Sequence, residues 1–245
     1  MRQRLAIATA VIVFCAWMST GAYAQYGYGL RDNIEINLFG GGSFYSTKDF
    51  DVSFPQSTVP VLGEFRLNHA EWRAGVRVGV YTRGHWSEEF FYSYEPNKIH
   101  LNRLTAPAVS TLLPIQVNNY GITALYYFSE NEGHSVRPFL SIGVGGTWYR
   151  LTPESEAFAH DPFRGDLLDM HDSNEFALNY GVGIKTRIAK WVGFRADIKG
   201  FLGRTPNFGI PRQSPDPTVT VFPVSGALSN GEASAGLVFY FFGRR

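Results

Sequence analysis

The chain has 245 residues, of which 44% are hydrophobic and 16% aromatic, and it carries 22 basic against 21 acidic residues. A charge this balanced leaves no basic excess for binding nucleic acid. The one cysteine, Cys15, rules out a framework of disulfides within the chain.

The first 24 residues have the composition of a secretory signal peptide. Arg2 and Arg4 give a positive start, Leu5 to Met18 is almost wholly apolar, and Ala22-Tyr23-Ala24 fits a small-x-small cleavage site. A membrane anchor is the alternative, but the apolar run is shorter than the ~20 residues of a spanning helix. We therefore predict a mature chain of residues 25–245 that forms one domain. Its charge is −1, because removing the two arginines leaves 20 basic residues against 21 acidic ones.

Eight stretches of the mature chain alternate apolar and polar residues, which is the period of a strand with two different faces. In one of them Trp72, Ala74 and Val76 share one parity, while Arg73 and Arg77 share the other. Each stretch is about as long as the ~10 residues that a tilted strand needs to cross a membrane. The predicted strands are 34–44, 72–81, 85–95, 115–128, 137–150, 174–188, 191–203 and 232–242.

The connections between these strands alternate between long and short. Long links are predicted at 46–69, 96–114, 151–173 and 204–231, and short ones at Arg83-Gly84, 129–136 and Ala189-Lys190. Outer-membrane barrels have short periplasmic turns and long external loops, whereas a soluble β-sandwich, the minority alternative, has no reason to alternate. We therefore predict an all-β fold, an eight-stranded antiparallel up-and-down transmembrane β-barrel, located in the bacterial outer membrane.

Aromatic residues gather at both ends of the predicted strands, where amphipathic rings prefer to meet lipid headgroups. At the loop ends lie Phe44, Tyr45, Trp72, Tyr92, Tyr94, Tyr120, Trp148, Tyr149 and Phe176, and at the turn ends Trp86, Tyr126, Tyr127, Phe128, Trp191 and Phe239 to Phe242. The residues that we assign to the two girdles are Trp72, Trp86, Tyr126, Trp148, Phe239 and Phe241.

If the apolar faces point to lipid, the charged faces point into the barrel, whose interior is about wide enough for side chains to fill. The predicted lumen charges are Glu35, Glu71, Arg73, Arg77, Glu89, Glu175, Lys185, Arg187, Arg195, Asp197, Lys199 and Glu232. Acids and bases nearly balance in this set, so we predict a network of ion pairs, because enclosed charges need partners. Some room is left by the glycines Gly40, Gly42, Gly75, Gly79, Gly143, Gly145, Gly181 and Gly183, which keeps a narrow channel open as an alternative.

The carboxyl-terminal strand ends in a recognisable pattern. Residues Ser234-Ala235-Gly236-Leu237-Val238-Phe239-Tyr240-Phe241 read polar-x-Gly-x-x-aromatic-x-aromatic. On this pattern and the eight strands, residues 33–242 resemble the small outer-membrane β-barrel family of the OmpA-like transmembrane-domain and opacity-protein type. The resemblance implies recognition by the barrel assembly machinery and contact with outer-membrane lipid and lipopolysaccharide. The chain departs from the pattern in that Phe242-Gly243-Arg244-Arg245 follow the last aromatic position, and no peptidoglycan-binding domain follows the barrel, so we expect no direct tether to the cell wall.

No motif predicts catalysis, a cofactor or a metal. His85, Ser87 and Glu89 share one strand face, but residues two apart stand ~6–7 Å from each other, too far for a base to bond a nucleophile directly. The acidic stretch from His160 to Asp172 offers cation ligands, but its spacing matches no calcium loop. We predict a non-catalytic protein with a structural or surface-interaction role and an extracellular partner at its loops. The alternative is a narrow porin-like channel for small solutes or an apolar ligand.

Overall fold

The computed structural model describes residues 34–46, 50–52, 63–103, 109–129, 136–159, 170–189, 191–216, 219, 221–223 and 226–241. The predicted signal peptide, residues 160–169 of the third long loop and residues 242–245 lie outside these described residues.

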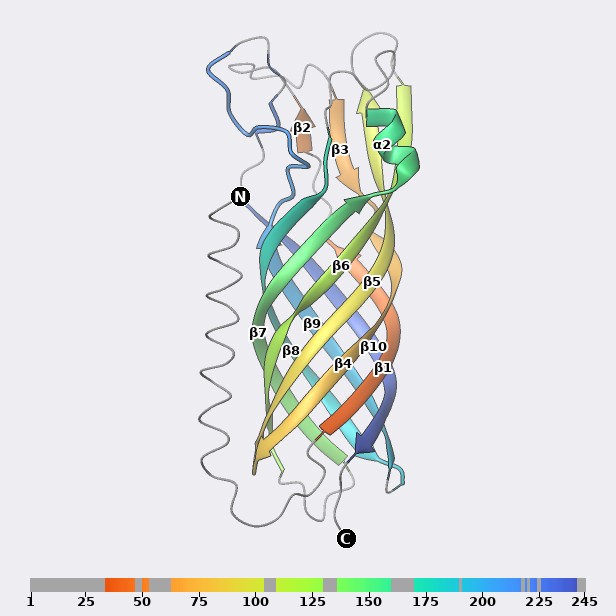
Figure 1. Ribbon diagram of the computed structural model, residues 1–245, viewed down its shortest axis with the longest axis vertical. Helices are drawn as coiled ribbons and strands as arrows, with labels where there is room; N and C mark the ends of the chain where they lie inside the picture. Colours follow the sequence, from red (N-terminus) through yellow and green to blue (C-terminus); the bar gives the residue numbers. More distant parts are fainter. Residues whose placement is uncertain are drawn as a thin grey trace.

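Eight long strands form a closed antiparallel barrel (Figure 1). They are β1 (Ile34–Tyr45), β4 (Ala70–Arg83), β5 (Trp86–Arg103), β6 (Val109–Tyr127), β7 (Val136–Leu151), β8 (Ser173–Arg187), β9 (Val192–Arg204) and β10 (Ala227–Phe241). Each of these pairs with the next one along the chain, and the pairing of β1 with β10 closes the barrel. The predicted fold class, an eight-stranded up-and-down barrel, is confirmed. The start of β1 and the end of β10 both lie on the side of the barrel that carries the short turns, at the bottom of Figure 1.

The alternation along the strands separates an apolar outer wall from a polar interior. Ile142, Ile198 and Phe176 have 70%, 64% and 63% of their surface exposed, whereas Arg73 and Arg195 are 1% and 0% exposed. Because successive side chains of a strand point to opposite faces, a slip by one residue would exchange the two sets.

Two of the strands, β5 and β6, extend further toward the loop end of the barrel than predicted. β5 and β6 stay paired up to Arg103 and Val109, so the predicted long loop at 96–114 is wrong: most of it is strand. Pro96 suggested a strand end, but it falls between the pairing of β5 with β4, which ends at Tyr94, and with β3 (Gly63–Leu67), which begins at Ile99. A proline is tolerated there because the ladder on that side is already interrupted.

Two of the other long connections carry short elements of their own. The first contains β2 (Phe50–Val52), which pairs with β3, and the third contains the helix α2 (Pro153–Ala159). The hydroxyl of Thr152 accepts the backbone N–H of Ser155 and so caps the start of this helix. Within the described residues no helix is long and apolar enough to cross a membrane.

Candidate functional site

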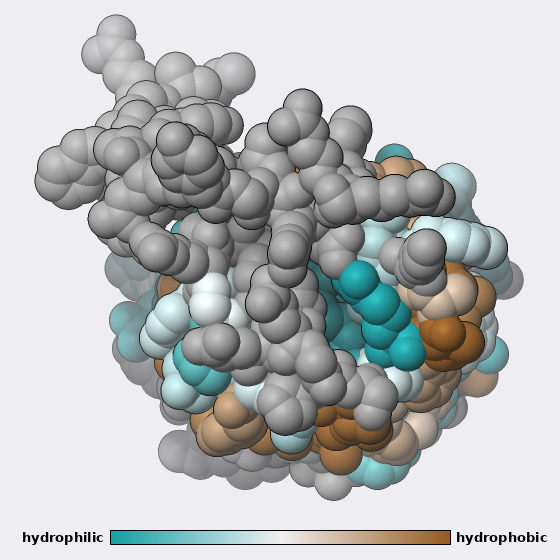
Figure 2. Space-filling view, turned by 90° about the horizontal axis from the view of Figure 1, so that it is seen from below, coloured by the Kyte–Doolittle hydropathy of each residue, from teal (hydrophilic) through white to brown (hydrophobic). Residues whose placement is uncertain are grey.

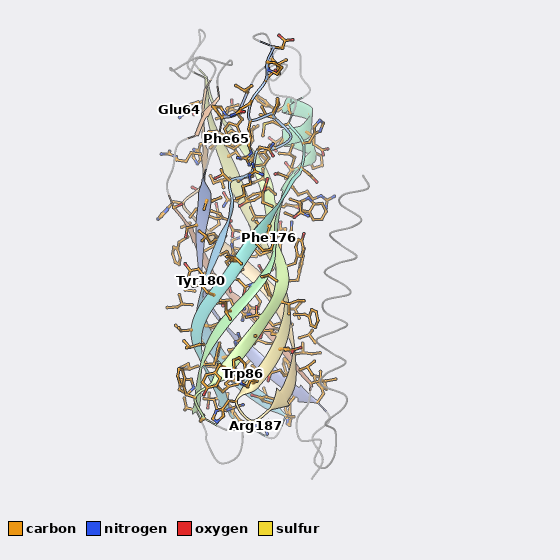
Figure 3. All side chains as sticks on the ribbon, turned by 90° about the vertical axis from the view of Figure 1, so that its left-hand side faces the viewer. Glu64, Phe65, Trp86, Phe176, Tyr180 and Arg187 are labelled. Atoms are coloured by element: carbon orange, nitrogen blue, oxygen red, sulfur yellow. The ribbon has the colours of Figure 1, made fainter. Side chains whose placement is uncertain are left out.

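The outer wall carries exposed aromatic side chains toward both ends of the strands. Trp86 lies near the turn end and Phe176 toward the loop end (Figure 3). Of the assigned girdle residues, Trp72, Trp86, Trp148 and Phe241 are exposed, while Tyr126 and Phe239 are half-buried. The half-buried pair is explained by ring contacts: Tyr126 packs edge-on against Trp86 at 5.1 Å, and Phe239 stacks on Trp191 at 6.3 Å.

Four tyrosines that the sequence grouped with the girdles lie at inward positions instead: Tyr45, Tyr127, Tyr149 and the half-buried Tyr240. Tyr45, Tyr127 and Tyr149 are 2%, 0% and 3% exposed. Each has the opposite parity to a neighbouring outward aromatic residue, so it cannot reach the outer wall. Viewed from the turn end, apolar side chains occupy much of the rim of the molecule and hydrophilic ones lie further in (Figure 2).

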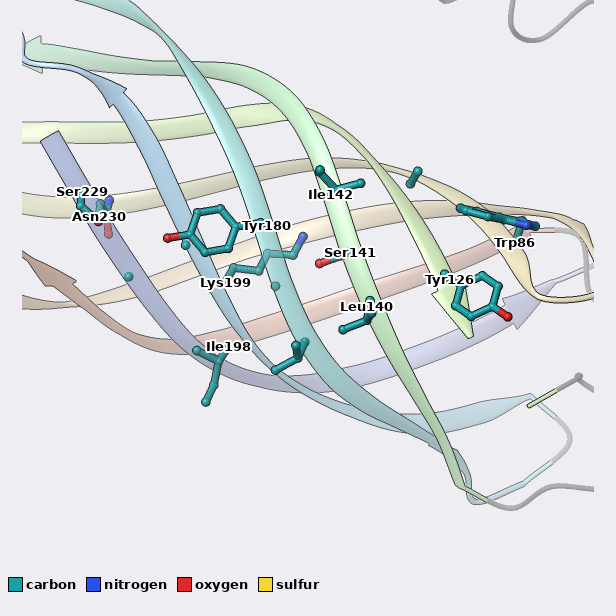
Figure 4. Close-up of a pocket in the computed structure, with 15 residues that line it drawn as sticks. Trp86, Tyr126, Leu140, Ser141, Ile142, Tyr180, Ile198, Lys199, Ser229 and Asn230 are labelled. Atoms are coloured by element: carbon teal, nitrogen blue, oxygen red, sulfur yellow. The ribbon is translucent and has the colours of Figure 1, made fainter. Parts of the chain in front are cut away.

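The outer wall also carries a groove (Figure 4). It is lined mostly by outward side chains of β5 to β10, among them Trp86, Leu140, Tyr180 and Ile198. At Gly200 the ring of Tyr180 lies across the wall, where a Cβ atom would stand 2.5 Å from the tyrosine Cζ. Most of the groove therefore belongs to the apolar exterior, although Ser141, Lys199 and Asn230 of the interior also line it.

The interior holds a connected network of buried charges. Arg195 contacts Glu89 through Nη1 and lies 2.7 Å from Asp197 Oδ2 through Nη2. Lys199 Nζ lies 3.1 Å from Glu89 Oε1, and Arg77 Nη2 lies 3.2 Å from Asp197 Oδ1. Each of these side chains is at most 2% exposed, so the charges are shielded from solvent and each depends on its partners.

The same network continues toward the loop end of the barrel. Arg77 Nη2 lies 2.8 Å from Glu232 Oε1, Arg73 Nη1 lies 3.1 Å from Glu232 Oε2, and Arg73 Nε donates to Glu95 at 3.0 Å. At the turn end a separate pair joins Lys185 Nζ to Glu35 Oε2 at 2.7 Å. Five cations and five carboxylates thus balance: Arg73, Arg77, Lys185, Arg195 and Lys199 against Glu35, Glu89, Glu95, Asp197 and Glu232.

Three of the twelve predicted lumen charges lie outside these ion pairs. Glu71 is half-buried near the loops and accepts a hydrogen bond from Asn68 at 2.6 Å. Glu175, also half-buried, lies 3.9 Å from Arg212 Nη2 of the fourth long loop. Arg187 differs from the prediction: it is exposed at the turn end (Figure 3), with its guanidinium 4.1 Å from the ring of Tyr240, because β8 ends at this residue.

One member of the network was missed from the sequence. Glu95 is fully buried against Arg73, but it precedes Pro96, where the predicted strand ended. Its parity is the same as that of Glu89, and this shared parity was the signal that could have placed it inside.

Above the charges, the loop end of the interior is apolar. The fourth long loop, which joins β9 and β10, inserts Phe208 into the barrel mouth, where its ring lies 5.3 Å from Phe65 and 6.0 Å from Tyr149. Phe208 has a φ of 49° and the following Gly209 a φ of 83°. A bulky residue rarely adopts this left-handed conformation, so burial of the ring must compensate for the backbone strain. Arg212 follows in the same loop, and its partial burial and the nearby Arg204 lower the pKa of its guanidinium.

The inward glycines are positions of close approach to large side chains. A Cβ on Gly75 would lie 2.6 Å from Phe39 Cζ, and one on Gly183 would lie 2.5 Å from Phe139 Cζ. A Cβ on Gly181 would lie 2.9 Å from the Cγ atom of the Lys199 side chain. The room that the sequence attributed to these three glycines is therefore occupied by neighbouring side chains.

Two of the three residues considered for catalysis, His85 and Ser87, contact backbone carbonyl oxygens instead of each other. His85 Nδ1 lies 2.6 Å from the carbonyl oxygen of Tyr127, and Ser87 Oγ donates to the carbonyl of Val80 at 3.1 Å. The described part of the chain contains no group of three side chains that could hold a metal ion.

The closed barrel, with its apolar exterior and its charged interior, defines the class of outer-membrane-type β-barrels. No family model matches the chain. No curated protein matches it either. Among solved structures, the outer membrane protein OprG from Pseudomonas aeruginosa is 12% identical with a TM-score of 0.52, and the match covers 87% of this chain and 98% of that one. Neisserial surface protein A is 12% identical with a TM-score of 0.45, and the match covers 85% of this chain and 97% of that one. The outer membrane protein AlkL is 11% identical with a TM-score of 0.46, and the match covers 88% of this chain and 93% of that one. The chain has the fold of the small eight-stranded outer-membrane barrels.

Proposed function

We propose that the chain is a non-catalytic outer-membrane protein, in which the barrel is an anchor with a filled lumen and the external loops form an interaction surface. The observation that carries this proposal is the occupancy of the interior. A neutral network of ion pairs fills its middle, and an apolar cluster capped by Phe208 fills its loop end. Ion-selective pores are lined by rings of accessible charge or carbonyl groups, whereas the charges here are consumed by one another.

The proposed location has independent support from the exterior. The exposed apolar wall is bordered at both ends by aromatic side chains, the distribution that lipid headgroups favour. With this location we propose the partners that the family resemblance implies: outer-membrane lipid and lipopolysaccharide, and the barrel assembly machinery acting on the pattern from Ser234 to Phe241 in β10. Export would depend on cleavage of the signal peptide, residues 1–24.

Conductance in a planar lipid bilayer tests the filled lumen. Residues 25–245 are refolded, and insertion is verified by a heat-modifiable shift on a gel. We expect inserted protein without discrete current steps. Reproducible steps from inserted protein would refute the filled lumen, and failure to insert would refute the membrane location.

One observation favours a second candidate, a binding site or route for an apolar ligand. The loop end of the interior is apolar, and its lid depends on Phe208, a residue in a strained conformation. If this candidate is right, Phe208→Ala opens the cluster, and an apolar fluorescent probe binds the inserted variant more strongly than the parent. Equal binding of the probe to both proteins would count against it.

A further inference from the structure

The apolar outer wall ends toward the loops in one row of interfacial residues. Asn118, Trp148 and Asn174 are register partners across β6, β7 and β8. From one level lower, the hydroxyl of Tyr92 donates to Asn118 at 2.6 Å, and the hydroxyl of Tyr120 donates to Asn174 at 2.9 Å. Since tyrosine and tryptophan rings place their polar tips at the headgroup level, this row marks the upper boundary of the hydrocarbon region.

Two cations lie above this row, Arg150 at the next outward position and Lys98 at the one after it. Arg150 follows Trp148 on the same face of β7, and its guanidinium lies 5.5 Å from the indole ring. Its register partner on β6 is Gln116, and Lys98 of β5 pairs with Pro114, one outward position higher than Gln116. Both Arg150 and Lys98 are exposed. Their strands, β7 and β5, lie on either side of β6, which carries Gln116.

No carboxylate of the described residues forms an ion pair with either cation. Asp172, which precedes β8 beside Arg150, uses its Oδ1 atom to accept the backbone N–H of Leu151 at 2.9 Å. The cations of the interior network, in contrast, all have carboxylate partners. Arg150 and Lys98 are therefore available to an anion that comes from outside the chain.

We propose that Arg150, Lys98 and Gln116 bind a phosphate group of lipid A in the outer leaflet, with the adjacent sugar resting against Trp148. The proposal rests on the outer-membrane location proposed above and names the lipid chemistry that this wall selects. The guanidinium offers paired N–H donors to phosphate oxygens, the ammonium offers a point charge, and the amide of Gln116 adds a neutral donor between them. The row of Asn118, Trp148 and Asn174 lies at the upper boundary of the hydrocarbon region. The groups above it therefore lie at the level of the lipid phosphates.

The test measures retention of a phosphorylated lipid. The chain is inserted into phosphatidylcholine nanodiscs that contain a minor fraction of lipid A, and the lipid A retained after extraction is counted by native mass spectrometry. We expect Arg150→Gln to reduce retention about five-fold and the double variant with Lys98→Gln about twenty-five-fold, from the usual contribution of one basic residue at a charged membrane surface. Arg150→Lys keeps the charge but loses the paired donors, so its retention should lie between that of Arg150→Gln and that of the parent.

Arg187→Gln is the matched control, because Arg187 is also an exposed arginine over an aromatic ring but lies at the opposite end of the barrel. Its retention should equal that of the parent. Equal retention by Arg150→Gln and the parent would overturn the proposal, as would displacement of lipid A by inorganic phosphate, which would indicate a site for the free anion. A chain that shows no heat-modifiable shift has failed to insert, and that result overturns the membrane location itself.

Discussion

Replacing Glu89 by glutamine should destabilise the barrel strongly, because three cations surround this one carboxylate. Glu89 contacts Arg195, lies 3.1 Å from Lys199 Nζ and 3.8 Å from Arg77 Nε. The two arginines keep Asp197 as a partner, but in the described chain Glu89 is the sole carboxylate within ion-pair distance of Lys199. The amide preserves the shape of the side chain, so the loss comes from the uncompensated buried ammonium and amounts to about 3–5 kcal/mol of unfolding free energy.

The assay is denaturant unfolding of the inserted barrel, followed by the heat-modifiable gel shift. Glu88→Gln is the control, since Glu88 is the adjacent residue on the outer face of the same strand and half-buried. Adding Lys199→Met to Glu89→Gln should recover most of the lost stability, because the variant pair then buries no unpaired charge. If the unfolding free energy of Glu89→Gln lies within about 1 kcal/mol of that of Glu88→Gln, the ion pairs contribute no more than exposed pairs do. That result would refute the conclusion that the network is enclosed.

Two further substitutions test the two faces of the wall. Ile142→Arg, at a side chain 70% exposed on the outer wall, should cost about 2–4 kcal/mol near the bilayer midplane when measured by refolding into vesicles; unchanged stability would place this face in water. Gly183→Ala would put a Cβ 2.5 Å from Phe139 Cζ and should cost about 1–3 kcal/mol by overpacking. Gly40→Ala meets nothing closer than 3.9 Å, so in the same titration it should remain near the parent value.

The faces of the strands could be predicted from the sequence, but the ends of the strands could not. Parity alone assigns Arg73 and Arg77 to one side of β4, and the length of the alternating stretches identifies that side as the interior. The sequence did not predict the part of β5 from Pro96 to Arg103, because a proline ends a strand unless the neighbouring strand is itself interrupted at the same height. That break, between β3 and β4, is a property of the pairing and leaves no mark in the local sequence.

The ion pairs themselves could not be predicted for a related reason. Arg73 and Glu232 are 159 residues apart, and Arg195 and Glu89 are 106 apart. Parity shows that each side chain points inward but not at which height along the barrel it lies, since height depends on strand tilt and stagger. The position of Phe208 in the barrel mouth could not be predicted either, because its left-handed backbone is stabilised by a contact between its ring and that of Phe65, which lies far away in the sequence on β3.

The buried charges contribute more to the choice of strand register than to the free energy of unfolding. Desolvation offsets much of what an enclosed ion pair gains, so an apolar interior of the same volume would be about as stable. It would also make the two faces of every strand alike, and a strand shifted by one residue would then meet little resistance in lipid. With the network in place, the same shift turns Arg73, Arg77 and Arg195 toward hydrocarbon, at about 2–4 kcal/mol for each arginine near the midplane. We therefore infer that an interior replaced by matched apolar residues would still insert but would refold into a mixture of registers, which cross-strand disulfide trapping would resolve as more than one pairing.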